Sequence, residues 1–405
     1  MNTMGDGNQI QENRRPTQGQ LALVRALPDN DKVNWTPETW TVPVAPSFGE
    51  QRFEAEQTRI FNRMALPAGP AGLAPENGSY VCRTVYGKEV IFTRDTEGEF
   101  HAFLNVCQHR GSRIVIDQET HRGKLLSCPF HAWGYDLKGR LAAVPREETF
   151  GKLDKSSHGL PKLQCRELGG LIWLKMDPEA DDDFSTVPVE LIADLEALGL
   201  PTMHLFATGM HDMEADWKLP MDTFQEGYHV VRLHAATLKG RFEDSLEIVD
   251  MLGLHIRRVS GRIGYRRDQL EDKDHSLAEL RKLVTFHYTL FPSAVLICSQ
   301  IYVNLMVFMP ISPTSCRVVN YMLTDRPPTT EKEFDRFTRS HELTDKVTFQ
   351  EDFAAAVYGQ AGISTGALKE LTLCPLERHV WTFHTLVDEM VKGRDPATAA
   401  AAVAG

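Results

Sequence analysis

The sequence has no long uninterrupted hydrophobic run. Its most apolar stretch, residues 293–311, is interrupted by Ser299, Gln300 and Asn304, side chains that are costly to place in lipid. We therefore predict buried strands in this stretch and no membrane span. The first twenty residues are polar and lack the apolar core of a secretory signal, which predicts a cytoplasmic protein.

Positive charge and cysteine are also scarce. The chain carries 44 Lys and Arg residues against 55 Asp and Glu residues, a net charge of -11. A surface of that sign repels nucleic acid and anionic lipid, so neither is an expected partner. The seven cysteines show no disulfide-like spacing, which favours free thiols or metal ligands.

The chain is long enough for two domains, because 405 residues exceed the usual size of one hydrophobic core. We expect an α+β fold in which residues 1–49 form an arm, loosely held up to about residue 35. Residues 50–178 are predicted to begin with a helix at 50–64 and to form a small all-β domain. Short β-branched and aromatic runs between turn signals predict an antiparallel meander at 78–103.

Residues 179–405 are predicted to form the second domain, after an acidic, proline-containing linker at 177–188. The alanine-rich end at 396–405 is expected to fray. The pattern predicts helices at 189–199 and 331–359, strands within 286–322, and a strand end that leads into a helix at 216–238.

Two Cys/His pairs lie at short internal spacing in the β-rich part of the chain. Cys107 pairs with His109, and Cys128 pairs with His131. Zinc favours four such ligands and tolerates similar spacings. The spacing alone therefore leaves a zinc site and an iron–sulfur site equally open.

The residues around these pairs resemble the Rieske signature almost position for position, with C-x-H-R-G at 107–111 and C-P-F-H-A-W-G-Y-D-x-x-G at 128–139. The resemblance implies one 2Fe-2S cluster in a Rieske domain at residues 50–178. Cys107 and Cys128 would hold its inner iron, and His109 and His131 its outer iron near solvent.

A second motif separates an oxygenase from a non-catalytic Rieske electron carrier. Glu226 is followed after two positions by His229, and His229 after four more by His234. This segment resembles the catalytic motif of the Rieske non-haem iron oxygenases, in the alpha (oxygenase) subunit of the aromatic-ring-hydroxylating dioxygenase family. On an ideal helix His234 is turned by roughly 140 degrees from His229. The two can meet one ion only if the helix is distorted.

The resemblance implies a mononuclear Fe(II) held by both histidines and one carboxylate, an arrangement that leaves coordination positions open for oxygen. In the family this carboxylate lies on a late helix, and residues 349–353 resemble that region. We predict Asp352 as the ligand, with Glu351 as its competitor, and count Asp222 with the catalytic residues. Residues 179–405 would then form a helix-grip-like catalytic domain, on which the arm at 1–49 packs.

The resemblance also implies how electrons reach the mononuclear iron. Its cluster and iron are paired across subunits of a head-to-tail homotrimer, α3 or α3β3, and an acidic residue bridges them. Glu226 occupies that position, with His131 and His229 as its partners. No nucleotide-binding motif appears in the chain, so a separate flavin-containing reductase or a ferredoxin would deliver electrons from NAD(P)H.

Substrate identity is the least constrained expectation. We predict a largely hydrophobic pocket that includes residues from 286–309 and accepts an aromatic or other hydrophobic molecule, hydroxylated with O2. The alternative is oxidation of a methoxyarene or quaternary amine, since Glu at position 226 is common among such relatives. A cation would need an aromatic cage, for which Tyr288, Tyr302 and Trp381 are available. The pocket candidates on the motif helix are Met221, Phe224, Val230 and Leu233.

Overall fold

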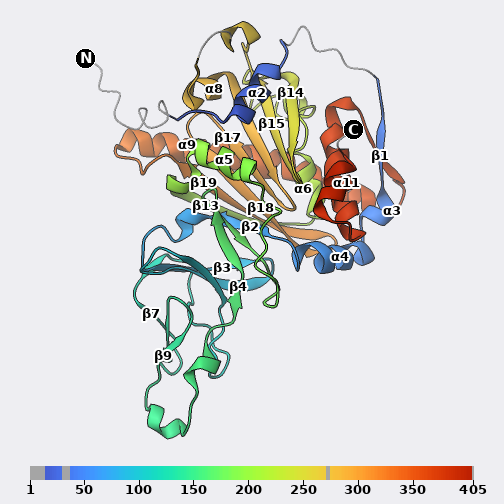
Figure 1. The fold of residues 1–405 in the computed structure, drawn as a ribbon. Coiled ribbons are helices and arrows are strands. Elements are labelled where there is room, and N and C mark those ends of the chain that lie inside the picture. Colours follow the sequence, from blue (N-terminus) through green and yellow to red (C-terminus); the bar gives the residue numbers. More distant parts are fainter. Residues whose placement is uncertain (1–13, 30–36, 271–273, 404–405) are drawn as a thin grey trace, which may run out of the picture. The chain divides into compact units, whose positions relative to one another are not determined.

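A computed structural model describes residues 14–29, 37–270 and 274–403 (Figure 1). The chain forms two compact units. The smaller is Phe61–Phe184, and the larger combines the residues before it with Ser185–Gly405. These limits differ from the expected 50–178, because Arg52 and Glu56 on helix α4 (Glu50–Glu56) belong to the larger unit, where Arg52 lies 3.0 Å from Asp388. The domain limits inferred from the sequence stay predictions.

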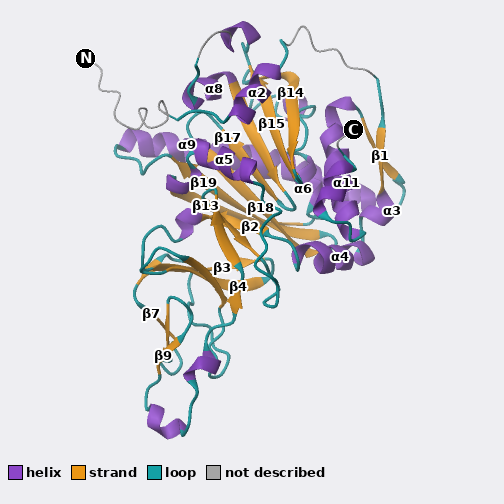
Figure 2. Cartoon of the chain, viewed as in Figure 1, coloured by secondary structure: helices purple, strands orange, loops and turns teal. Residues whose placement is uncertain are grey.

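The smaller unit consists of strands and loops with only short helical turns in between (Figure 2). As predicted, β3 (Ser79–Val85), β4 (Lys88–Arg94) and β5 (Phe100–Leu104) form an antiparallel meander. The strands of the smaller unit form three sheets. The first, in sheet order, contains β10 (Lys162–Leu163), β5, β4, β3 and β6 (His121–Arg122). The second contains β11 (Cys165–Leu168), β12 (Leu171–Leu174) and β2 (Leu66–Pro70), and the third contains β7 (Leu125–Ser127), β8 (Gly134–Asp136) and β9 (Leu141–Ala143). Its short helical turns are Ala71–Leu73, Glu147–Phe150 and Lys155–His158.

The larger unit is built on one seven-stranded antiparallel sheet, seen with its strands side by side in Figure 1. The β-prone runs at 286–322 supply its centre, as expected from their sequence. In sheet order the strands are β13 (His204–Met213), β19 (Ser315–Thr324), β18 (Val303–Ser312), β17 (Ala294–Cys298), β16 (Val284–Leu290), β15 (His255–Arg262) and β14 (Phe242–Leu252). A separate antiparallel pair joins β1 (Trp40–Pro43) to β20 (Glu370–Leu373).

Helices surround this sheet. They are α2 (Gln18–Ala26), α3 (Val44–Ser47), α4, α5 (Val189–Leu198), α6 (Lys218–Asp222), α7 (Val230–Leu233), α8 (Leu277–Leu283), α9 (Glu331–Val347), α10 (Phe353–Ser364), α11 (Arg378–Val391) and α12 (Pro396–Ala401). Single turns lie at Gln57–Phe61, Leu200–Thr202, Arg267–Leu270, Thr348–Asp352 and Pro375–Glu377. None of the helices in the described residues is both long and apolar enough to cross a bilayer.

The two faces of the seven-stranded sheet are covered by different helices. Successive side chains of a strand point to opposite faces, so two adjacent residues show what covers each face. The hydroxyl of Tyr288 on β16 lies 3.0 Å from Asp194 on α5 and accepts a hydrogen bond of 2.9 Å from Gln20 on α2. His287, its neighbour on β16, instead lines a cavity that residues of α9 close from the other side. The cavity therefore lies on the face opposite α2 and α5.

Two expectations about the chain ends need correction. Part of the predicted loose arm is the helix α2, which has a complete capping box at Thr17 and buries Leu23 and Val24. The alanine-rich end includes α12, in which Asp395 caps the first turn and Ala399 is buried. Residues 1–13, 30–36 and 404–405 lie outside the described residues. Capping and burial explain why segments of low sequence complexity are ordered.

Candidate metal centres

The two Cys/His pairs lie on loops with the same backbone pattern. In each loop the amide of the cysteine donates to the carbonyl five residues later, and its own carbonyl accepts from the amide four residues later. That fourth residue has positive φ in both cases, 75° at Gly111 and 56° at Ala132. Such a turn aims the cysteine and the histidine of one loop in the same direction.

The four side chains separate into a buried sulfur side and a more accessible nitrogen side. Cys107 and Cys128 are buried in the same hydrophobic core cluster. The rings of His109 and His131 lie 4.7 Å apart between centroids, and His131 is exposed. The Tyr135 hydroxyl lies 3.3 Å from the sulfur of Cys107.

This arrangement fits two metal ions better than one. A single zinc ion binds at about 2.0–2.3 Å, so its ligand atoms lie at most about 4.6 Å apart. In the described part of the chain, three or more metal-ligating atoms come within 4.8 Å of one another in two places only, and neither includes these cysteines or histidines. A binuclear cluster, with thiolates on one iron and imidazoles on the other, suits the separation.

The predicted distortion of the motif helix is present. Helix α6 ends at Asp222, the next residues are non-helical, and α7 is a single turn bracketed by His229 and His234. Gly227 lies in the break, where a Cβ would come within 2.9 Å of Glu247 on β14. The break therefore lets both histidines face the same point.

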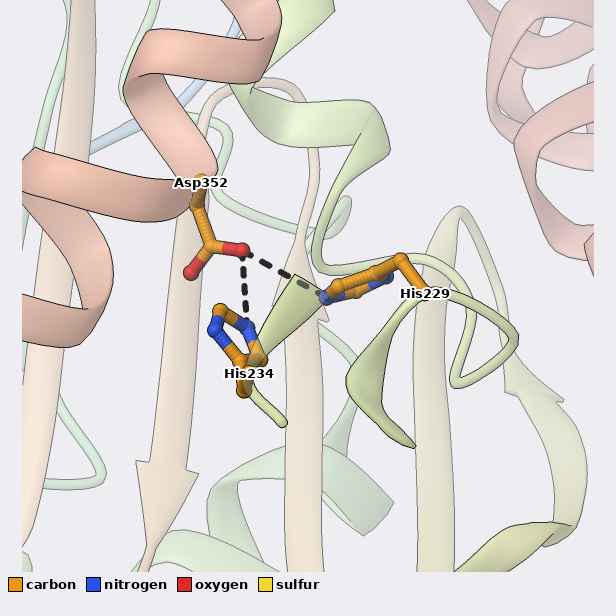
Figure 3. Close-up of side chains that lie close together, drawn as sticks. All are labelled: His229, His234 and Asp352. Atoms are coloured by element: carbon orange, nitrogen blue, oxygen red, sulfur yellow. Dashed lines mark ion pairs between the residues drawn. The ribbon is translucent and has the colours of Figure 1, made fainter. Parts of the chain in front are cut away.

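His229, His234 and Asp352 form one of the two ligand groups, with one ligand atom of each within 4.8 Å of the others. Asp352 Oδ1 lies 3.4 Å from His229 Nε2 and 3.0 Å from His234 Nε2, as the dashed lines in Figure 3 show. Two distant parts of the chain thus meet. The histidines flank α7, and Asp352 is the last residue of the π-helical turn Thr348–Asp352.

Each imidazole has a second carboxylate on its other nitrogen. Glu226 hydrogen-bonds Nδ1 of His229, and Glu351 Oε2 lies 2.6 Å from Nδ1 of His234. An Nδ1–H that donates to a carboxylate leaves the lone pair of Nε2 for a metal ion. Glu351, expected only as a competing ligand, therefore contacts the histidine on the side away from Asp352.

The surroundings favour positive charge at this point. Burial opposes protonation of His229, but Asp352 and Glu226 outweigh it and raise its pKa to about 9. Burial opposes protonation of His234 as well, and Asp352 and Glu351 again raise the pKa. Asp352 Oδ1 is buried without a hydrogen-bond partner among the described residues. Two imidazoles and one orphaned carboxylate oxygen fit a divalent cation.

Asp222, the other expected catalytic residue, lies elsewhere. Both of its oxygens contact His384 Nε2 on α11, at 3.0 and 2.9 Å. Asp222 is not among the residues that line the cavity. The pair joins α6 to α11, so the contacts of Asp222 position the motif segment, and its catalytic assignment stays a prediction.

A cavity of about 480 Å³ opens beside the three converging residues. Phe224 and Val230 line it as predicted, whereas Met221 and Leu233 do not. Met221 is fully buried on α6, and Leu233 is 37% exposed. Neither side chain therefore contributes to the wall of the cavity.

Residues 286–309 line part of the cavity and the cavity is largely apolar, both as predicted, but the side chains that this run contributes are mostly polar. The cavity-facing positions of this run are His287, Ile297, Ser299, Gln300, Ile301, Tyr302 and Asn304. Of the three proposed cage aromatics, Tyr302 lines the cavity, whereas Tyr288 and Trp381 do not.

Sequence reasoning missed several cavity residues on β15. Arg258, Ser260 and Arg262 alternate along the strand and all face the cavity. Arg258 lies 3.3 Å from Glu247, and burial raises the pKa of Glu247 to about 7 against the opposing effect of Arg258. These residues could have been found from the sequence, because polar residues at every second position of a β-prone run indicate that they share one face of a strand.

Comparison with known proteins agrees with this geometry. Residues 68–163 match the family model of the Rieske [2Fe-2S] domain, and residues 201–393 match that of the ring hydroxylating alpha subunit, catalytic domain. The two matches imply a Rieske 2Fe-2S cluster and a mononuclear iron.

Among curated relatives, the glycine betaine monooxygenase oxygenase subunit of Pseudomonas aeruginosa is 32% identical over 201 residues, which cover 49% of this chain and 46% of the relative. The chain thus spans about half the length of the curated relatives it matches. The quaternary ammonium Rieske monooxygenase CntA with L-carnitine has a TM-score of 0.73 at 18% identity, covering 87% of this chain and 95% of that one.

Naphthalene 1,2-dioxygenase from Rhodococcus sp. has a TM-score of 0.69 at 19% identity, covering 93% and 99% of the two chains. These likenesses establish the α+β fold, with a Rieske domain and an antiparallel catalytic domain. With both family models matched in the expected order along the sequence, the chain combines a Rieske [2Fe-2S] domain with the catalytic domain of a ring hydroxylating alpha subunit.

Proposed function

We propose that this chain is the terminal oxygenase component of a multicomponent Rieske oxygenase, which uses O2 and electrons from a separate reductase or ferredoxin to oxidise a small organic molecule. The observation that carries the proposal is the convergence of His229 Nε2, His234 Nε2 and Asp352 Oδ1, where the buried Oδ1 has no hydrogen-bond partner among the described residues. A non-catalytic electron carrier has no use for such a site.

In this proposal Cys107, Cys128, His109 and His131 hold the cluster, and His229, His234 and Asp352 hold the iron. When bound, the iron supplies the chemistry of dioxygen activation, and the cluster supplies an electron. The protein residues fix the geometry: Glu226 and Glu351 orient the two imidazoles, and the cavity holds the substrate beside them.

The assembly is also proposed. We infer a homotrimer, α3 or α3β3, in which Glu226 of one subunit connects to the cluster of the next through His131. The support is that Glu226 is hydrogen-bonded to His229 and that His131 is exposed, so each offers one end of such a link.

Oxidation of a quaternary amine is the second candidate reaction. It is supported by the likeness to glycine betaine and carnitine monooxygenase subunits and by Glu at position 226. The aromatic cage predicted for it is not assembled, since Tyr302 alone of its three members lines the cavity. The reaction would therefore need another way to hold the cation.

Metal analysis of matched variants tests the proposal. The parent should contain about two cluster irons, two sulfides and one further iron per chain. Cys107→Ser and Cys128→Ser should remove the visible absorption of the cluster, whereas His229→Ala and His234→Ala should keep it and abolish substrate oxidation. Stoichiometric zinc without sulfide, or loss of the cluster in the histidine variants at 229 and 234, would contradict two separate centres.

A further inference from the structure

The cavity has a metal end and an opposite end, and two elements run between them. On α9 and its π-helical turn the lining extends from Asp352 back to Arg339 and Arg336. On β15 it extends from Arg258 to Arg262. Arg258 belongs to the metal end, because its partner Glu247 lies against Gly227 in the motif segment.

Strand β15 and helix α9 give similar lengths for the cavity, measured from its metal end to its far end. Four residues of strand separate Arg258 from Arg262, which is about 13 Å. Eight residues of helix separate Asp352 from Thr344, which is about 12 Å. Arg262 and Thr344 lie toward the same end of the cavity. Arg262 donates to Thr285, and the next residue of that strand is in register with Cys298 and Val303. Tyr302 precedes Val303, and its hydroxyl lies 3.3 Å from Thr344 Oγ1.

Arg262 is held in place at this far end. Its Nη1 donates to Thr285 Oγ1 at 3.2 Å, and its guanidinium carbon lies 5.4 Å from the centre of the Phe242 ring. The side chain is half-buried. Arg241 lies next to it across the sheet, because Phe242 pairs with Arg262 and the amide of Ile263 donates to the carbonyl of Arg241 at 3.1 Å. Burial and this neighbouring cation both lower the pKa of Arg262.

Three exposed arginines, Arg241, Arg336 and Arg339, line the cavity as well. Within the described residues, neither they nor Arg262 have an ion pair with a carboxylate, in contrast to Arg258 with Glu247. Glu243, the acidic side chain in this part of the lining, accepts a hydrogen bond from the backbone amide of Gly264. The far end therefore carries an excess of positive charge.

The walls between the two ends are largely apolar. They are formed by Phe224, Val230, Leu246, Ile297, Leu343 and Val347. A molecule that fills the cavity would place an apolar body against these side chains and one polar end beside Arg262.

We infer that the substrate is an organic carboxylate with an apolar body on the order of 10 Å long, whose carboxylate binds Arg262 and Arg241 while its far end reaches the metal site. This inference rests on the proposed function and specifies its substrate class. A guanidinium forms paired hydrogen bonds with a carboxylate, and adjacent cations without a counter-ion gain most from binding an anion. A neutral hydrocarbon, or a quaternary amine that carries no carboxylate, would leave the arginines without an anionic partner.

Calorimetric titration of the holoprotein tests the inference with four probes: 6-phenylhexanoate, 6-phenylhexan-1-ol, 6-phenylhexyltrimethylammonium and benzoate. The long acid should bind at least tenfold more tightly than the other three. Arg262→Gln should lower the affinity for the long acid by tenfold or more and leave the alcohol unchanged. Arg262→Lys should lose part of the affinity, because it keeps the charge and loses the paired donors.

Matched controls separate this inference from the proposed function. Arg266→Gln removes an exposed arginine that follows β15 but does not line the cavity, so it should bind the long acid as the parent does. Arg241→Gln, at an exposed position, gives a second test if Arg262→Gln does not fold. Both metal centres are assayed first, and their absence would contradict the proposed function. If they are present and the alcohol or the ammonium probe binds as tightly as the acid, or Arg262→Gln and Arg241→Gln bind it normally, the inferred substrate class is wrong.

Discussion

Two consecutive carboxylates contact opposite nitrogens of one imidazole. Glu351 lies 2.6 Å from Nδ1 of His234, and Asp352 lies 3.0 Å from Nε2. Asp352 also reaches His229, whereas Glu351 instead accepts a hydrogen bond of 2.7 Å from Thr237. The side chains are chemically alike, so their roles follow from the direction in which each points.

This difference predicts unequal effects of removing each carboxylate. Asp352→Ala should abolish binding of the mononuclear iron and substrate oxidation, because an anionic ligand is lost. Glu351→Gln should weaken iron binding by roughly 10–100-fold, the usual effect of losing an outer partner of a metal ligand. Iron content after dialysis against a graded chelator measures both, with the cluster spectrum as internal control. Full iron content in Asp352→Ala together with complete loss in Glu351→Gln would reverse the two roles.

At the scale of elements, both sides of the metal site depend on interrupted helices. The predicted helix at 331–359 is present but contains the π-helical turn Thr348–Asp352 between α9 and α10. The predicted helix within 216–238 is broken between α6 and α7. A π-helical turn contains one more residue than an α-helical turn and is frequent at functional sites.

Deleting Gln350 tests the role of the π-helical turn. The residue is exposed, and its loss should let the turn close as a regular α-helix, which rotates Asp352 by about 100 degrees relative to α9. We expect loss of the mononuclear iron with the cluster spectrum intact. Gln350→Ala keeps the number of residues and should bind iron normally. A deletion variant with normal iron content would show that the extra residue is dispensable.

For the whole molecule, the structure places Glu226 against His229, and the resemblance assigns it a partner in the next subunit. Glu226 is nearly buried, and its two oxygens contact both Nδ1 and the backbone amide of His229. Such contacts hold the histidine without occupying a metal position. A second contact, to His131 of another subunit, belongs to the proposed trimer.

Glu226→Gln should therefore slow electron transfer between centres without removing either metal. The substitution keeps the length of the side chain and removes its charge. Both metal contents should stay near those of the parent, and reductase should still reduce the cluster, while substrate-dependent reoxidation slows by at least tenfold. Single-turnover stopped-flow absorbance measures the rate. Reoxidation at the rate of the parent, or full turnover by a verified monomer, would rule out the route through Glu226.

The sequence by itself determined the features that depend on short spacing. The paired Cys/His loops, the spacing of Glu226, His229 and His234, and the β-prone runs of the central sheet could all be recognised, because a chelating loop or a strand is specified within a few residues. Even the distortion of the motif helix could be predicted, since a regular helix cannot bring His229 and His234 to one ion.

Only the tertiary structure decided which side chains face the cavity. Tyr288 and His287 are neighbours on one strand, yet the first is buried against α2 and α5 and the second lines the cavity. Likewise, Met221 and Leu233 do not line the cavity, whereas Arg262 does. The alternation of a strand can be read from the sequence, but not which helix covers which face. That depends on packing between segments far apart in the chain, 94 residues for Tyr288 with Asp194 and 268 for Tyr288 with Gln20.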